Sequence, residues 1–301
     1  MEKIKTILVA TDLRERSAEV LKAAGKLAQT GSARLHVLHA FDLPSGPYTG
    51  RADEGISFEG RINEAKSTLQ RQIAEHVPAG VEVSSDVVIF VAHKAILEHA
   101  AAINADLIVL GTHRERPVGD AILGSTADRV VRTSDVPCLV VRSQLTVPLR
   151  KVLIPTDMSA ASEGALDVAL RWTRTLCSDG GPAGKGELIV LHVVERQMGD
   201  RKEEFENTVV RPELRQVVTA AHSRVGEEAG VTVREEVRWG PSAVDEIGSV
   251  IRQEQIDLVV VATHGHGALK RALVGGVATG VARVSSCSVL LVPPKLWTRE
   301  E

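Results

Sequence analysis

The sequence predicts an α/β fold made of two tandem Rossmann-like, doubly wound domains, each with a five-stranded parallel sheet. Three observations lead to this prediction. Short apolar runs alternate with segments of helical period, and these runs are hydrophobic at consecutive positions, as in parallel strands buried on both faces. In addition, the second half of the chain repeats the first half about 150 residues later.

The repeat is visible in four pairs of segments: ILVATDL (7–13) and VLIPTDM (152–158); LHVLHA (35–40) and LIVLHV (188–193); DLIVLGTHR (from Asp106) and DLVVVATHG (from Asp257); AILGSTADRVVR (from Ala121) and ALVGGVATGVAR (from Ala272). The last two pairs share one offset of 151 residues. A period this long is a whole domain rather than a small repeat unit. We therefore expect one domain over residues 1–145 and a second over residues 149–297.

Within the first half, strands are expected where β-branched and other apolar residues run together, at Ile7–Ala10, Leu35–Ala40, Val81–Phe90, Leu107–Leu110 and Cys138–Val141. Helices are expected where apolar residues recur with helical spacing, at Ala18–Leu27, Ile62–His76, Lys94–Ile103 and Ser125–Arg132. The second half repeats the strand order near 152–155, 188–194, 231–238, 258–262 and 289–292. Such alternation implies βαβ crossovers and a parallel sheet.

In each half, one long insertion follows the second strand. Asp42–Gly60 is rich in Gly and Pro, which predicts a mobile loop, whereas Glu195–Arg211 is charged and is predicted to be partly helical. The join between the halves, from Ser143 to Arg150, is short and contains Pro148.

Composition narrows the classes of function. Aromatic residues make up 3% of the chain and the net charge is −3, which disfavours stacking platforms for single-stranded nucleic acid and a basic surface for duplex DNA. The chain has no apolar run of membrane-spanning length, and its N-terminus enters a strand without a signal peptide. Cys138, Cys177 and Cys287 lack CxxC spacing, which favours reduced thiols. We therefore expect a cytoplasmic protein that binds neither nucleic acid nor membrane.

Candidate binding residues fall where doubly wound sheets bind ligands, beyond the carboxyl ends of the strands at the switch in strand order. The first strand of each half ends in Thr11-Asp12 or Thr156-Asp157. The loop after the fourth strand opens the last helix with Gly124-Ser125 or Gly275-Gly276. Glycines at a helix start let backbone N–H groups approach a phosphate, whose charge the helix dipole favours. An acidic side chain nearby can hydrogen-bond a sugar or base.

These residues also have a purely structural interpretation. Asp12 precedes Glu15 by three residues, which is the spacing of a helix capping box, whereas Asp157 precedes Ala160, so capping explains Asp157 less well. The glycines Gly124 and Gly275 also fit close packing of a helix on the sheet.

Metal binding is the less favoured interpretation of the histidines. His264 and His266 have no Cys or carboxylate at ligand spacing, and His36 and His39 are expected as ordinary strand residues. The sequence contains no motif of nucleophile, base and oxyanion donors. This argues against a dedicated hydrolase, and we expect no catalytic residue.

This arrangement resembles the universal stress protein family, in its tandem two-domain form, across essentially the whole chain. The nucleotide-binding members carry Gly, two residues, Gly, nine residues, then Gly followed by Ser or Thr, after the fourth strand. The first half matches this pattern at Gly111, Gly124 and Ser125 but has Arg114 at the second glycine. The second half matches at Gly265 and Gly275 but has Ala262 at the first glycine and Gly276 at the hydroxyl position.

The resemblance implies ATP as the ligand, with AMP or ADP as alternatives, and leaves open an accompanying Mg²⁺ ion. It also implies that Asp12 and Asp157 contact the adenosine part of the nucleotide. Contacts from the second strand, largely through the backbone, fall on Ala40 and Val193.

Local charge favours the second half as the nucleotide site. Four basic residues without an acidic neighbour lie on its loop, namely His264, His266, Lys270 and Arg271. In the first half, the positive electrostatic potential of the corresponding loop is partly cancelled, because Arg114 and Arg116 are interleaved with Glu115 and Asp120.

The leading hypothesis is therefore an adenine-nucleotide-binding regulatory protein of the stress-response type, with a protein partner that the sequence does not identify. The alternative is a nucleotide-free interaction module that dimerises through edge strands, which the departures at Arg114, Ala262 and Gly276 motivate. The last strands, Pro137–Arg142 and Ser288–Pro293, end each sheet with an exposed edge. We expect these edges to pair, either within the chain as an internal pseudo-dimer or between two chains as a homodimer.

Overall fold

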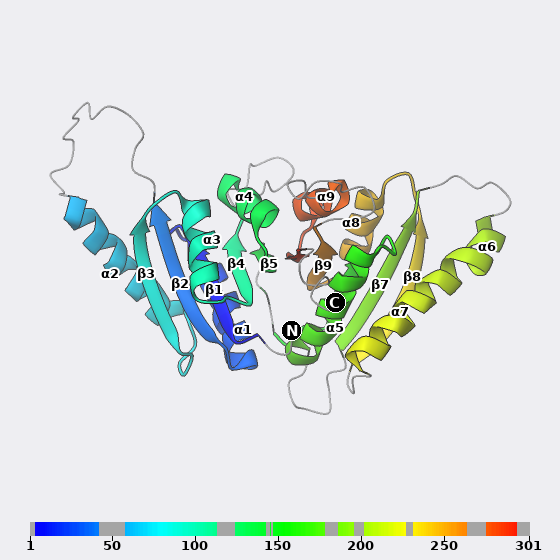
Figure 1. The fold of residues 1–301 in the computed structure, drawn as a ribbon, viewed down its shortest axis with the longest axis horizontal. Coiled ribbons are helices and arrows are strands. Elements are labelled where there is room, and N and C mark those ends of the chain that lie inside the picture. Colours follow the sequence, from blue (N-terminus) through cyan, green and yellow to red (C-terminus); the bar gives the residue numbers. More distant parts are fainter. Residues whose placement is uncertain are drawn as a thin grey trace.

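The described part of the chain forms one continuous sheet of ten strands, in the order β3-β2-β1-β4-β5-β10-β9-β6-β7-β8. The structure is a computed structural model that describes residues 4–41, 58–112, 124–142, 145, 147–177, 186–195, 202–226, 231–263 and 275–293. Figure 1 shows the two halves side by side, with β5 near the middle and with β3 and β8 toward the outside.

The first half alternates strands and helices as the sequence predicts, through β1 (Thr6–Thr11), α1 (Ser17–Gly31), β2 (Arg34–Phe41), α2 (Phe58–His76), β3 (Val83–Ile89), α3 (Ala92–Ala102), β4 (Leu107–Gly111), α4 (Ser125–Thr133) and β5 (Cys138–Val141). The second half runs through β6 (Lys151–Pro155), α5 (Ala160–Leu176), β7 (Gly186–Val194), α6 (Lys202–Phe205), η2 (Glu206–Val210), α7 (Arg211–Val225), β8 (Val231–Trp239), α8 (Ala243–Glu254), β9 (Leu258–Ala262), α9 (Gly276–Val284) and β10 (Ser288–Val292). Each predicted strand is present to within two residues at either end.

The two predicted insertions differ in outcome. The loop predicted over Asp42–Gly60 was too long, because α2 already begins at Phe58, with Glu59 in its first turn where the helix dipole favours an acid. Residues 42–57 lie outside the described residues. The charged insertion Glu195–Arg211 is helical from Lys202 onward, which confirms the prediction of partial helix.

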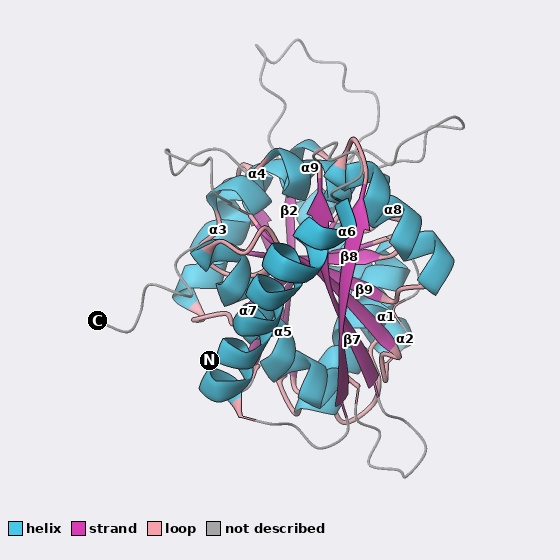
Figure 2. Cartoon of the chain, turned by 90° about the vertical axis from the view of Figure 1, so that its right-hand side faces the viewer, coloured by secondary structure: helices cyan, strands magenta, loops and turns pink. Residues whose placement is uncertain are grey.

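Two apolar layers enclose the sheet. Helices α1, α2, α5 and α7 cover one face, and α3, α4, α8 and α9 cover the other; Figure 2 shows helices on both sides of the strands. Successive residues of a strand point to opposite faces, so Ile7 and Val9 enter the first layer and Leu8 enters the second. Both layers continue through β5 and β10, so the two halves share their hydrophobic core.

The junction between the halves is an antiparallel pair, β5 with β10, in which Val140 faces Val289 and Leu139 faces Leu290. The other neighbouring strands are parallel. This pairing confirms the expected internal pseudo-dimer. It also joins the two predicted five-stranded parallel sheets into a single sheet.

The side chain of Arg142, which directly follows β5, crosses this junction. The Arg142 guanidinium donates to the carbonyl oxygen of Ser285 at 3.1 Å and to that of Ala282. Both carbonyls lie at the C-terminal end of α9, where the helix dipole favours a cation. Arg142 therefore fastens the end of the first half to the last helix of the second.

A carboxylate that occurs in both halves holds the strands together at the edge of the sheet where the parallel strands begin. Asp106 accepts hydrogen bonds from the backbone N–H groups of Lys5 at 2.8 Å and Thr6 at 3.0 Å. Asp257 makes the equivalent bonds, at 2.7 and 3.0 Å, to the start of β6. The acid that opens the repeated segment before β4 and β9 is thus structural, because it sets the start of the first strand against the fourth.

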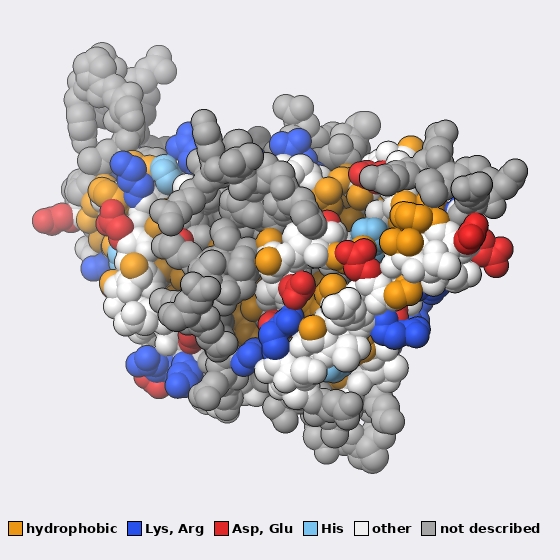
Figure 3. All heavy atoms as spheres, turned by 45° about the vertical axis from the view of Figure 1, so that its right-hand side comes forward, with side chains coloured by type: hydrophobic (Ala, Val, Ile, Leu, Met, Phe, Trp, Pro, Cys, Tyr) orange, Lys and Arg blue, Asp and Glu red, His pale blue; other side chains and the backbone are white. Residues whose placement is uncertain are grey.

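The described surface carries charges of both signs. Figure 3 shows Lys and Arg side chains interspersed with Asp and Glu, in agreement with the small net charge of −3. Some are paired, as in the ion pairs of Arg224 with Glu163 and Asp167. None of the described helices is both long enough and apolar enough to cross a membrane.

Replacing Arg142 by Ala is expected to lower the free energy of unfolding by about 1.5–3 kcal/mol, because two carbonyls lose a charged donor. Arg142→Lys should recover only part of this, since an ammonium lacks the fixed fork of a guanidinium. The exposed Arg129 of α4 supplies a control, whose replacement by Ala should change stability by less than about 0.5 kcal/mol. Urea denaturation measures the free energy of unfolding of all three variants. Equal stability of the Arg142→Ala chain and the Arg129→Ala control would contradict a stabilising role for the Arg142 hydrogen bonds.

Candidate functional site

In each half, the strand order switches sides between the first strand and the fourth. The chain adds β2 and β3 on one side of β1 and then returns to add β4 and β5 on the other, so β1 and β4 flank the switch. β6 and β9 flank it in the second half. The parallel register brings to the carboxyl edge the predicted residues Asp12, Ala40 and Gly111 of the first half and Asp157, Val193 and Ala262 of the second.

The first strand of each half ends in the same turn. The Leu13 N–H donates to Thr11 Oγ1 at 3.0 Å, and the Met158 N–H donates to Thr156 Oγ1 at 3.0 Å. Leu13 and Met158 have φ angles of 61° and 60°, in the left-handed region that is unfavourable for residues with a side chain. This strained turn presents Asp12 or Asp157 at the edge of the sheet.

A histidine on the second strand supports this turn in both halves. His39 Nδ1 lies 2.9 Å from the carbonyl oxygen of Thr11, and His192 Nδ1 lies 2.9 Å from that of Thr156. A carbonyl only accepts, so each Nδ1 carries a proton. His39 was expected to be an ordinary strand residue; its repetition as His192 in the second half is the sequence signal that points to this shared role.

The two acids are held differently, and Asp12 does not form the capping box that its spacing to Glu15 offered. Asp12 Oδ1 accepts from the Arg14 N–H at 3.1 Å and from Ser17 Oγ at 2.8 Å, but not from Glu15. The capping interpretation of Asp12 is therefore wrong, because α1 begins only at Ser17. Asp12 Oδ2 lies 3.7 Å from Arg14 Nε, and the Asp12 side chain remains 51% exposed.

Asp157 sits beside a helix start that has its own cap. Its Oδ1 accepts from the N–H of Ser159 at 3.1 Å and from its hydroxyl at 2.5 Å. Ser159 Oγ in turn accepts from the Ser162 N–H at 3.3 Å, as an N-cap side chain does. Capping of α5 therefore falls to Ser159, and these bonds hold the Asp157 carboxylate at the sheet edge.

The last helix of each half begins at a glycine. Gly124 and Gly275 are the N-cap residues of α4 and α9, with φ of −59° and −55° and ψ of 151° and 148°. Any residue adopts these angles, so the backbone conformation does not require glycine here. The Gly275 N–H donates to the Thr263 carbonyl at 2.7 Å, which ties the start of α9 to the end of β9.

The residues around these glycines differ in how much space they leave. A Cβ at Gly276, the first residue of α9, would meet no heavy atom within 4 Å, so the described residues leave this position open. Ser125 is the exposed equivalent on α4. A Cβ at Gly111 would lie 3.0 Å from Val20 Cγ2, which supports a packing role for that glycine. Ala262 occupies the equivalent place in β9.

The first turns of α4 and α9 also differ in charge. Asp128 in the first turn of α4 accepts two hydrogen bonds from Arg132, at 2.8 and 3.1 Å, and this bonding raises the pKa of Arg132. The first turn of α9 has no acidic residue and carries Thr279 at the equivalent position. An anion at the start of α9 would therefore meet the helix dipole without a competing carboxylate.

Several predicted residues cannot be placed against this geometry. Outside the described residues lie Arg114 and Arg116 of the first half and His264, Gly265, His266, Lys270 and Arg271 of the second. Their contribution to the site stays a prediction from the sequence.

Other reactive groups lie away from the switch. Cys138, Cys177 and Cys287 are free and buried, and burial raises the pKa of the first two thiols to about 12 and of the third to about 11. Thiols in this state are poor nucleophiles. A groove of about 710 Å³ that includes Arg211 and Arg215 follows the outer side of α7, not the strand ends.

Comparison with known proteins gives one consistent family. The profile of the Universal stress protein family matches residues 3–142 and again residues 148–293. A "Universal stress protein in QAH/OAS sulfhydrylase 3'region" from Thermus aquaticus is 32% identical over 140 residues, which cover 46% of this chain and 98% of that protein. Universal stress protein Slr1230 of Synechocystis is 24% identical over 311 residues, covering 95% of this chain and 99% of that protein.

The fold has a full-length counterpart among solved structures. A universal stress protein from Archaeoglobus fulgidus superposes with a TM-score of 0.67 at 20% identity, covering 96% of this chain and 98% of that chain. The tandem, doubly wound architecture is therefore shared along the whole length.

The strained turn yields a prediction about stability. Met158→Gly should be more stable than Met158→Ala by about 1 kcal/mol, because both remove the same apolar contacts while only glycine relieves the positive φ. Ala220→Gly in α7 is the control, where glycine in an ordinary helical position should cost about 0.5–1 kcal/mol. Thermal denaturation decides the comparison. A Met158→Ala chain at least as stable as Met158→Gly would show that the turn is not strained.

Proposed function

Because the chain belongs to the Universal stress protein family, we propose that it is a cytoplasmic adenine-nucleotide-binding regulatory protein. ATP is the proposed ligand, with ADP and AMP as alternatives and Mg²⁺ as the counter-ion of the triphosphate. Nucleotide binding would favour one conformation or partner surface, and turnover would be slow or absent.

One observation carries this proposal. In both halves a Thr-Asp turn ends the first strand at the switch in strand order, where the last helix begins at a glycine. Ligands of doubly wound sheets bind at this place. The carboxylate offers a hydrogen-bond acceptor to a ribose hydroxyl or an adenine amino group. The first-turn N–H groups of the helix offer donors to phosphate oxygens.

The glycine at the helix start is best explained by the space that it leaves. Its φ and ψ are those of an ordinary extended residue, so conformational freedom gives no reason for it. A phosphate that receives hydrogen bonds from the N–H groups of a first turn must come within about 3 Å of the backbone. A larger side chain at Gly275 would compete for that space.

The second half is the better candidate for the site. The first turn of α9 lacks the acid that Asp128 places in α4, and Gly276 leaves open space. The Asp157 carboxylate is already oriented by Ser159, so less side-chain freedom is lost when it accepts from a ligand. The phosphates would then lie at α9, with the adenosine between Asp157 and the backbone of Val193.

Calorimetric titration of the purified chain with ATP and Mg²⁺ tests this proposal. Wild-type protein should bind ATP, and Gly275→Val should weaken binding at least tenfold, which corresponds to about 1.4 kcal/mol. Valine is compatible with the φ and ψ of this position, so the variant is expected to fold.

The matched control is Gly124→Val, which makes the same change at the equivalent position of α4. This variant should bind ATP as the wild type does if the second half holds the site. Loss of binding in Gly124→Val alone would move the site to the first half. Absence of binding to ATP, ADP and AMP at millimolar concentration in the wild type would remove the proposal.

The alternative function is a nucleotide-free interaction module. The departures at Arg114, Ala262 and Gly276 motivated it. The edge strands through which such a module would dimerise, β5 and β10, already pair with each other within the chain. The outer strands of the sheet are β3 and β8, and β8 carries charged residues such as Arg234 and Glu236 that disfavour edge pairing. Light scattering separates the two: a stable dimer without nucleotide would favour the alternative.

A further inference from the structure

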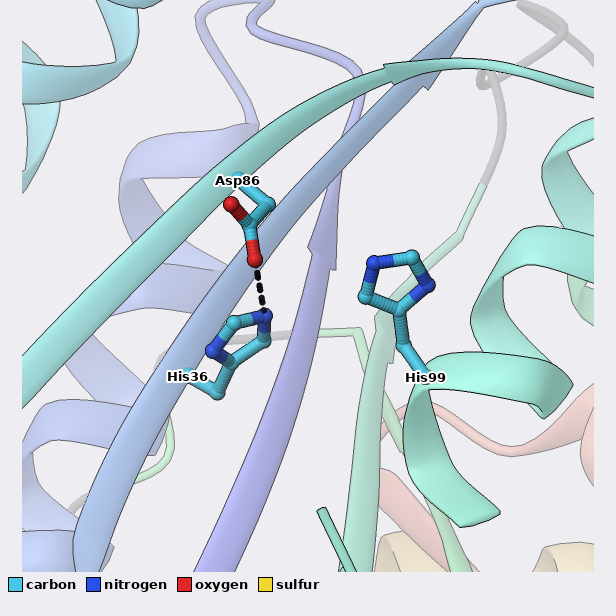
Figure 4. A group of neighbouring side chains, drawn as sticks. All are labelled: His36, Asp86 and His99. Atoms are coloured by element: carbon cyan, nitrogen blue, oxygen red, sulfur yellow. Dashed lines mark ion pairs between the residues drawn. The ribbon is translucent and has the colours of Figure 1, made fainter. Parts of the chain in front are cut away.

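Two histidines and an aspartate from distant parts of the first half meet beside the outer strands of the sheet. His36 lies on β2, Asp86 on β3 and His99 on α3. One ligand atom of each side chain lies within 4.8 Å of those of the other two. Figure 4 shows His36 and Asp86 pointing toward each other and the His99 ring approaching from the helix.

In both histidines the Nδ1 atom is already hydrogen-bonded, so the Nε2 atom of each ring is the one available to the cluster. His99 Nδ1 lies 2.9 Å from the Ala95 carbonyl, so Nδ1 carries the proton and Nε2 has a lone pair. His36 Nδ1 is bonded to Ser84 Oγ at 2.8 Å. Its Nε2 is buried without a hydrogen-bond partner, although Asp86 Oδ2 lies 3.3 Å away.

The nearest partner of this buried nitrogen is the Asp86 carboxylate, at an ion-pair distance of 3.3 Å but without hydrogen-bond geometry, so the nitrogen can still accept a ligand. His36 is only 8% exposed. Burial lowers the pKa of His36, and Asp86 opposes this only in part.

The second half shows that the fold does not need this cluster. The register of the sheet places Ile189 of β7 at the position of His36, and the start of α8 places Val250 at the position of His99. Both are apolar and no more than 1% exposed. Since Ile and Val fill this layer in one half, packing alone does not explain two histidines in the other.

We propose that His36, Asp86 and His99 form a binding site for a divalent transition-metal ion of the zinc class. Two imidazoles and one carboxylate are a ligand set that Zn²⁺ accepts, with water in the fourth position. Tetrahedral bonds of about 2.0–2.1 Å separate ligand atoms by about 3.3 Å. His36 and Asp86 already have this spacing, and the distances to His99, which are within 4.8 Å, would shorten by up to about 1.5 Å on binding.

The surroundings have two further properties of metal sites. Each Nδ1 is fixed by a hydrogen bond, His36 to Ser84 and His99 to Ala95, as second partners orient metal-binding histidines. Asp86 is 55% exposed on the outer strand β3, which gives the ion access from solvent. A bound ion would connect α3 to the edge of the sheet. The site is separate from the proposed nucleotide site and does not depend on it.

The test is titration of the full chain, freed of metal with a chelator, with ZnCl₂ in the absence of nucleotide. The wild type should bind zinc, with a rise in its thermal midpoint because the ion binds only the folded chain. The variant His36→Ile/His99→Val, which installs the residues of the second half, should lose one site or weaken it by on the order of 100-fold. Cobalt in place of zinc should give visible absorption bands that the double variant lacks.

Two further variants keep the outcome decisive. Asp86→Asn changes a half-exposed residue without disturbing the buried layer, and should weaken zinc binding by on the order of 10-fold or more. His222→Gln, on α7 and outside the cluster, should bind zinc as the wild type does. The proposal is overturned if the wild type binds no zinc, or if both cluster variants bind it with unchanged affinity and number of sites.

Discussion

The antiparallel pair of β5 and β10 is the interaction on which the rest of the molecule depends. Without it, Val140 and Val289 would be edge residues of two separate sheets; with it, both apolar layers run through the whole chain. The pair buries the strands whose exposed edges would otherwise invite association with other chains. It leaves β3 and β8 as the outer strands, so the site of each half lies inside a larger sheet, between its junction and its edge.

Much of this fold could be predicted from the sequence because parallel buried strands leave a strong signal. Continuous apolar runs such as Leu107–Gly111 and Leu258–Ala262 are recognisable without alignment, and the repeat confirms each one against its partner. The limits of helices were less predictable. α2 begins at Phe58, earlier than its apolar period indicates, because an acid in the first turn extends a helix without adding a buried residue.

The candidate site was predictable only in part, and the reason is distance along the chain. The repeated acids and glycines stand next to strand ends, so the sequence places them at the carboxyl edge. The spacing of Asp12 and Glu15 suggested a capping box at the start of the first helix, but Asp12 instead accepts hydrogen bonds from the Arg14 N–H and the Ser17 hydroxyl. The His39 bond to Thr11, and the meeting of His36 with His99, join residues that no short motif connects.

The short join between β5 and β6 gives the two halves a property that separate subunits lack. Identical subunits that pair freely always present two copies of the same site. Here a half with Gly111 and Ser125 is permanently matched with a half that has Ala262 and Gly276 instead. One gene product therefore contains an obligate pair of unlike partners in fixed one-to-one proportion, and a change in one half is never diluted by exchange with unaltered copies.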